Sequence, residues 1–143
     1  MSDDDWLGAL PEPQRETARR ARALVNRAMP RGYVETPAPG MVTWVVPLSR
    51  YPRTYNGQPL AYVALAARRT GCVLYLTGIY QDPAGDARLR EAYAQAGRKI
   101  DLGKSCLRFK RFDDLHAEAV AAEIARLPVD AFLAQHEAAR ARR

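Results

Sequence analysis

The segment Leu60–Ile79, which reads LAYVALAARRTGCVLYLTGI, decides the fold. It contains two apolar runs, 60–67 and 71–79, separated only by a short polar connection. Runs of this length and composition are typical of strands. Parallel strands need a crossover of a dozen or more residues, so this connection can join only antiparallel neighbours. The segment therefore predicts an antiparallel pair of strands.

Further strands are expected on both sides of this pair. Residues 41–46 read as one strand and residues 103–111 as another. Asn56-Gly57 is a pair that favours a tight hairpin turn. Prolines punctuate the region before residue 60, at positions 37, 39, 47, 52 and 59. Proline has no backbone donor, so the strands among them should be short or lie at sheet edges.

Helical patterns fill both ends of the chain. The expected helices cover 13–29, 87–96, 115–127 and a segment that begins near Pro128. Asp86 is the expected N-cap of the second helix, and Asp113 or Asp114 that of the third. These elements predict an α+β fold: a mostly antiparallel sheet of about five strands, with the N- and C-terminal helices packed on one face.

The length and composition of the chain limit the class of protein. The chain has 143 residues, the usual length of one domain, so we expect a single domain over 1–143 with a core from about 6 to 137 and short flexible termini. It has neither an apolar leader nor a run of about 18 apolar residues, so we expect a cytoplasmic protein with no membrane partner. Cys72 and Cys106 should be free thiols there. We expect a monomer or a homodimer.

The formal charge of +6 raises the question of nucleic acid. The arginines are spread along the whole chain instead of forming one tract, which indicates a solvated, compositional charge. Nucleic acid is therefore not the expected main partner, although the charge leaves it open.

Six stretches resemble one known family, and 97–110 is the most specific of them. The stretches are 10–13, 40–41, 54–60, 74–76, 97–110 and 113–115. Over about 6–137 the chain resembles the YdhG-like family, known as domain of unknown function 1801. The resemblance implies a compact sheet-and-helix domain. Members have been likened in fold to frataxin, which implies an intracellular iron(II)-carrying role for some.

The first helix does not suit iron(II), because it is rich in arginine and a positive surface repels a cation. The dense acidic cluster of the chain, Asp3, Asp4 and Asp5, lies at the terminus. A second, weaker candidate for metal is the group Asp113, Asp114, His116 and Glu118, whose alternative role is to cap a helix. No cofactor is identified, and iron(II) enters only through the family resemblance.

Alternation along 103–111 predicts that Leu107 and Phe109 face the core. The opposite face is then a basic strip that carries a thiol, made of Lys104, Cys106, Arg108 and Lys110. Nearby cations could activate Cys106, which makes it a candidate reactive thiol. The alternative is an ordinary solvated sheet face.

An anion-binding patch of Lys104, Ser105 and Arg108 is the sharper hypothesis for this strip. Tyr62, beside Ala64 and Ala66, and Tyr75 are added as candidate ligand contacts, since small residues beside a ring can leave a shallow pocket. Core packing is the alternative role for both rings.

Three functions follow from these observations. The first is a non-enzymatic protein that binds an unknown small ligand or anion. The second is a frataxin-like iron carrier. The third is a nucleic-acid or protein interaction module that uses the basic helix 13–29. No catalytic motif is present, so an enzyme is the least expected of the functions, and it would act through Cys106.

Overall fold

The computed structural model describes residues 6–142, which form an α+β fold around one antiparallel sheet. Its six strands lie in the order β1-β2-β3-β4-β6-β5. The strands are β1 (Val34–Ala38), β2 (Met41–Val46), β3 (Leu60–Arg68), β4 (Gly71–Leu76), β5 (Leu102–Gly103) and β6 (Cys106–Phe109). The expected pair at 60–79 is present as β3 and β4, and Arg68 pairs with Gly71 across their turn. The sheet has one strand more than the expected five.

Two departures from the expectation account for the strand count. Residues 34–38 form the edge strand β1 although Pro37 lies within it, because alternate N–H groups of an edge strand have no neighbour to bond. The expected strand 103–111 is interrupted at Lys104, which has a positive φ of 57°. The chain turns back there and forms the β5–β6 hairpin.

The helices are α2 (Glu12–Ala28), α3 (Thr77–Gln81), α4 (Pro83–Gln95), α5 (Ala117–Ala125) and α6 (Val129–Ala141). The first and last match the expectation, and α6 begins directly after Pro128. The strand expected to reach residue 79 ends at Leu76, and the chain continues as α3. No helix within the described residues is long and apolar enough to cross a membrane.

The expected N-caps of the two middle helices are wrong. Asp82, not Asp86, caps α4, because its Oδ1 accepts the Ala84 N–H at 3.1 Å. The helix expected at 115–127 begins at Ala117, where the Nδ1 atom of His116 accepts the Ala119 N–H at 3.2 Å. The two aspartates expected to cap it lie in a 3₁₀ turn, Phe112–Asp114.

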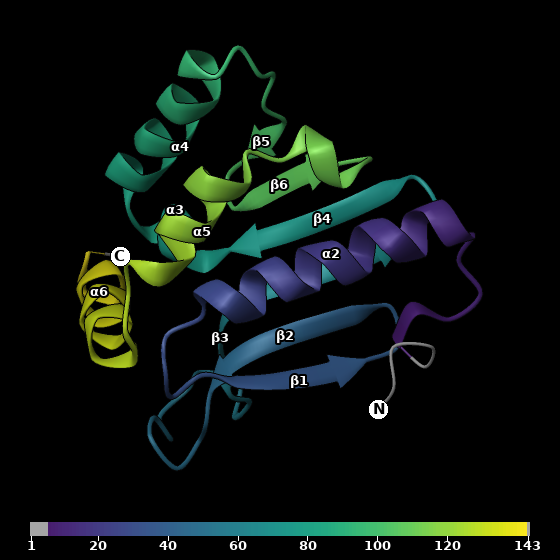
Figure 1. The fold of residues 1–143 in the computed structure, drawn as a ribbon. Coiled ribbons are helices and arrows are strands. Elements are labelled where there is room, and N and C mark those ends of the chain that lie inside the picture. The colour runs from purple at the N-terminus through teal and green to yellow at the C-terminus, as the bar shows by residue number, and fades with distance from the viewer. Residues whose placement is uncertain (1–5, 143) are drawn as a thin grey trace.

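The helices cover one face of the sheet and leave the other open. α2 crosses the sheet over β3 and β4, α5 lies beside α2, and α4 extends from the sheet edge (Figure 1). The core between α2 and the sheet is built from the buried row Val42, Leu65, Leu74 and Leu107, which pair across four strands. No described helix lies on the opposite face.

β3 contains a bulge that turns Tyr62 away from that open face. Trp44 pairs with Val63 and Val45 pairs with Ala61, so Tyr62 has no partner on β2. An extra residue in one strand redirects a side chain. Tyr62 consequently points toward the helices. Simple alternation had predicted that it shares a face with Ala64 and Ala66.

Tyr62 and Tyr33 form a stacked pair with a centroid distance of 4.4 Å. Their hydroxyls donate to the last carbonyls of the α5 segment: Tyr62 to Ile124 at 2.6 Å and Tyr33 to Leu127 at 2.8 Å. Burial raises the pKa of both phenols, so both remain protonated donors. Phe132 of α6 packs on this pair, with its ring centroid 4.8 Å from that of Tyr62. The last helix therefore packs on its own chain and joins the same core.

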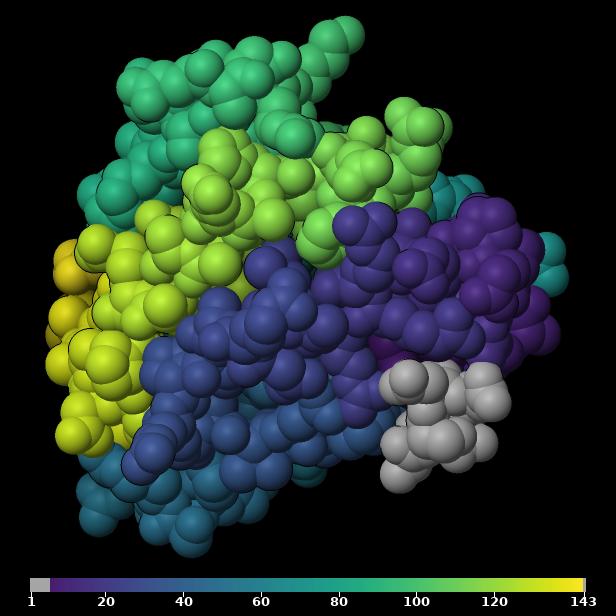
Figure 2. Space-filling model, in the orientation of Figure 1, coloured from purple at the N-terminus to yellow at the C-terminus, as the bar shows by residue number. Residues whose placement is uncertain are grey.

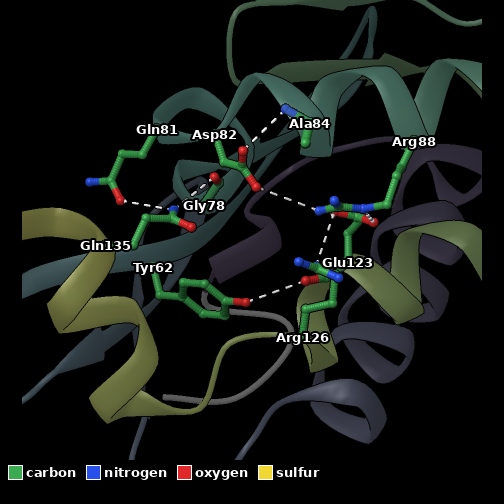
Figure 3. Close-up of polar contacts among 9 residues, drawn as sticks. All are labelled: Tyr62, Gly78, Gln81, Asp82, Ala84, Arg88, Glu123, Arg126 and Gln135. Atoms are coloured by element: carbon green, nitrogen blue, oxygen red, sulfur yellow. Dashed lines mark hydrogen bonds and ion pairs between the residues drawn. The ribbon is translucent and has the colours of Figure 1, made fainter. Parts of the chain in front are cut away.

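A polar cluster joins α4 to α5 beside this aromatic group. Arg88 donates two hydrogen bonds to Glu123, at 2.9 and 3.0 Å, and lies 3.7 Å from Asp82 (Figure 3). The Glu123 side chain is only 10% exposed. A two-pronged arginine–carboxylate pair of this geometry fixes orientation as well as distance. We assign this cluster a structural role, because it holds α4 in place.

A second polar network ties α2 to the first two strands. Glu35 of β1 accepts hydrogen bonds from Arg22, and from Asn26 at 2.7 Å. Asn26 in turn accepts the indole N–H of Trp44 at 2.9 Å. The hydrogen bonds from Arg22 are the main cause that lowers the pKa of Glu35, and burial opposes them.

Replacement of Glu35 by glutamine is expected to reduce stability by about 1–2 kcal/mol at pH 7, because the bonds to the charged carboxylate are lost. The folded pKa lies below the unfolded value, so the native carboxylate stabilises the fold above about pH 4.5. Its contribution disappears as the pH falls through the folded pKa. Urea unfolding of both proteins at pH 7 and about pH 3 measures this. The difference in unfolding free energy between the native protein and Glu35→Gln should be smaller at about pH 3 than at pH 7.

The matched control is Glu12→Gln, because Glu12 is 69% exposed and pairs with Arg19 on the surface. Surface pairs contribute little, so this variant should change stability by less than about 0.5 kcal/mol. A Glu35→Gln difference that is the same at both pH values would contradict the titration argument.

Candidate anion-binding groove

A groove with a volume of about 870 Å³ lies beside the β4–β6 pair. Its walls come from the β3–β4 turn, from β6 and the residues after it, and from the loop 98–101. Figure 2 shows the notch between the chain after α4 (green) and the segment after β6 (light green). Ligand sites commonly have volumes of about 300–1,000 Å³. The groove therefore has room for a small organic ligand.

The groove gathers more positive than negative charge. Arg68, Lys99 and Lys110 line it, and none of the three forms an ion pair within the described part of the chain. Arg108 pairs with Asp101 at 3.6 Å, but both side chains are more than half exposed. Such a pair is weak in water, so Arg108 remains able to contact an anion.

The other charged residues of the groove are used by the fold. Arg98 donates to the Asp113 carbonyl. Asp114 accepts the Arg111 N–H at 3.0 Å, and Arg20 lies 3.9 Å from Asp113. These contacts neutralise part of the acidic wall of the groove, so the cations without an ion-pair partner set the sign of its charge.

Apolar and aromatic groups complete the walls. Val73 and Tyr75 line the groove from β4, and Ile100 lines it from the loop. Tyr93 of α4 also contributes, and burial raises the pKa of its phenol. The buried Tyr93 hydroxyl has no hydrogen-bond partner of ordinary geometry. The groove thus combines cations with apolar side chains and the partly exposed ring of Tyr75.

The groove brings together only some of the residues expected from the sequence. Arg108 and Tyr75 line it. Lys104 and Ser105 lie in the β5–β6 turn and do not, and the Ser105 carbonyl accepts the Leu76 N–H at 2.8 Å. Tyr62 lies in the core, 2% exposed.

Sequence reasoning did not single out the three unpaired cations as site residues. Arg68 is the last residue of β3, Lys99 lies in the loop after α4, and Lys110 follows the end of β6. Strand alternation already places Lys110 in the basic strip with Arg108, although the expected anion-binding patch did not include it. Arg68 and Lys99 needed the order of the strands, which brings the two turns together.

Cys106 lies half-buried on the open face, directly opposite Tyr75 on β4. Cys72 is on the helical side and 2% exposed, and burial raises its pKa to about 11. The two thiols therefore differ in access, and burial also lowers the thiolate content of Cys72.

Iodoacetamide at about pH 7.5 is expected to add one group to the native protein, at Cys106, and none at Cys72 until the chain unfolds. Intact-mass measurement over time gives both rates, and Cys106→Ser should abolish the native adduct. A Cys106 rate equal to that of a small free thiol would remove the reactive-thiol hypothesis. Modification of both cysteines in the native protein would contradict the burial of Cys72.

The candidate metal ligands have other roles. Asp114 and His116 are helix or turn caps, and Asp113 lies near Arg20. Within residues 6–142, no group of three or more His, Cys, Asp and Glu side chains could hold a metal ion. Glu118 lies in the first turn of α5, where a carboxylate suits the helix dipole. Asp3, Asp4 and Asp5 lie outside the described residues.

The arginines of α2 do not form a free basic face. Arg15 donates to the Gly8 carbonyl at 2.8 Å, and Arg19 pairs with Glu12 at 2.9 Å. Arg20 lies over the Phe112 ring at 4.2 Å, and Arg22 pairs with Glu35. Each of these four cations already has a partner within its own chain, and the fifth arginine of α2, Arg27, is exposed in its last turn.

No family model, no curated protein and no solved structure matches this chain. The resemblance to the YdhG-like family therefore stays a prediction.

Proposed function

We propose that this chain is a non-enzymatic binding protein for a small anionic ligand, held in the groove beside β6. The cluster of Arg68, Lys99 and Lys110, unpaired and joined by Arg108, is the observation that carries the proposal. Unpaired cations that face one concave surface raise the local concentration of anions.

The chemistry of the walls favours an organic anion over a bare inorganic one. Tyr75, Val73 and Ile100 offer apolar contact to a carbon skeleton or a ring, while the cations bind carboxylate or phosphate. Two arginines can also bind such groups through paired hydrogen bonds, which lysines cannot.

Calorimetric titration tests the proposal, with inorganic phosphate, citrate and adenosine monophosphate as probes at about 50 mM salt. We expect saturable binding of at least one probe, weakened about tenfold by the double change Arg108→Ala and Lys110→Ala. Higher salt should weaken it further, because the groove is open to solvent.

The matched control is Arg53→Ala, since Arg53 is an exposed arginine in the loop between β2 and β3, away from the groove. It should leave binding unchanged. Absence of saturation for every probe, or an equal loss in the control, would overturn the proposal. Nothing within the described residues favours the iron-carrier function, because no carboxylate cluster is present there.

A further inference from the structure

On β2, β3 and β4 the central positions of the open face are uncharged. One row across it pairs Thr43 of β2, Ala64 of β3, Tyr75 of β4 and Cys106 of β6. The next row pairs Met41, Ala66, Val73 and Arg108. No described helix covers these rows (Figure 1). The face therefore adjoins the groove, with Tyr75 and Arg108 shared between them.

Tyr75 is the aromatic residue of this face, and it is partly exposed. Its neighbours in the row are Ala64 and Cys106, both much smaller than a tyrosine. Directly opposed side chains on a sheet are close enough to shield one another, and these two are too short to do so. No other ring among the described residues contacts Tyr75. One side of its ring is thus available for stacking.

Cations follow Tyr75 on the β4–β6 half of the sheet, all on the side toward the β3–β4 turn. Arg108 projects from the same face two positions beyond Cys106, and Lys110 follows at the next alternate position. Arg68 ends β3 on this face, opposite Gly71. The nearby carboxylates are the exposed Asp101, which pairs with Arg108, and Asp113 and Asp114, which line the adjoining groove and have contacts of their own.

This pattern complements a polyanion with exposed rings. A protein partner would place both acidic and apolar groups here, and the apolar side chains of this half are small. A single strand of nucleic acid offers a flat base for stacking and a phosphate on either side of it. A duplex hides its bases, so only its backbone could contact this surface.

We propose that the β4–β6 half of the open face binds single-stranded nucleic acid. One base stacks on Tyr75, while Arg108, Lys110 and Arg68 bind the neighbouring phosphates. The inference rests on the proposed function, because the anion site in the groove becomes the phosphate site of the strand.

Fluorescence anisotropy with a labelled strand of about 12 nucleotides, as oligothymidine and as oligouridine, tests this. We expect affinity to exceed that of adenosine monophosphate and to fall steeply with salt. Tyr75→Ala should weaken binding by about tenfold, because a stacked base contributes about 1–3 kcal/mol, while Tyr75→Phe should retain it. Arg108→Ala should reduce the slope of log affinity against log salt by about one.

Two controls separate the site from general charge and from aromatic content. Arg53→Ala removes a cation outside the site, and Tyr80→Ala removes an exposed tyrosine of α3, which is 56% exposed. Neither should change the affinity. Comparison of the thymidine and uridine strands shows whether DNA or RNA is preferred.

The remaining outcomes are distinct. If the oligonucleotides bind no tighter than adenosine monophosphate, the strand-binding inference is overturned and the small-anion function stands. If neither the oligonucleotides nor adenosine monophosphate bind, both the inference and the proposed function are overturned. A Tyr75→Ala variant that binds normally, a duplex that binds equally well, or a dimer in solution in which Cys106 resists alkylation would each overturn it. The last result would assign the face to a second copy of the chain.

Discussion

Replacement of Phe132 by alanine is expected to lower the free energy of unfolding by about 3–5 kcal/mol. Phe132 is 0% exposed and packs on the Tyr33–Tyr62 stack, so its removal leaves a cavity between α6 and the sheet. The neighbouring tyrosines cannot move into the cavity easily, because their hydroxyls are bonded to backbone carbonyls at Ile124 and Leu127. Urea unfolding followed by circular dichroism measures the loss.

The matched control is Phe132→Leu, which keeps most of the apolar volume and should cost less than about 1.5 kcal/mol. An alanine variant that loses less than about 1 kcal/mol would contradict the packing of α6 on this chain's core. A separate early transition in helix content, with an unchanged main transition, would show instead that α6 unfolds as an independent unit.

The sequence predicts the parts of the fold that depend on local pattern. The β3–β4 pair follows from two apolar runs with a short connection, and α2 follows from apolar residues at helical spacing. Helix ends were predicted less well. Asp86 and Asp113 are good capping residues, yet the structure uses Asp82 and His116, because several residues near each helix end can accept the same N–H groups.

The bulge at Tyr62 could not be predicted from alternation. A bulge is defined by the pairing of one strand with the next, here of β3 with β2. The sequence of β3 alone carries no sign of it. The same limit applies to the groove. Arg108 and Tyr75 were named from strand patterns, but Arg68 and Lys99 come together with them only because β4 lies next to β6.

Replacement of Gly71 by alanine is expected to destabilise the protein by about 2–4 kcal/mol. Gly71 has a φ of +137°, a conformation that side chains other than glycine rarely adopt. A Cβ there would lie 2.8 Å from the Phe109 carbonyl oxygen, which is backbone and cannot rotate away. The strain and the collision therefore add, and β4 and β6 must separate at this end of the sheet.

The matched control is Gly57→Ala, because Gly57 also has a positive φ, +72°, but a Cβ added there would have no atom within 4 Å. It should cost only the conformational strain, about 1 kcal/mol. Equal losses for the two variants, measured by urea unfolding, would show that β6 can move freely. Because Gly71, Phe109 and Lys110 line the groove, the Gly71→Ala variant should also bind anions more weakly than Gly57→Ala under conditions where both remain folded. The close approach of β4 and β6 would then set the position of the cations as well as the stability of the sheet.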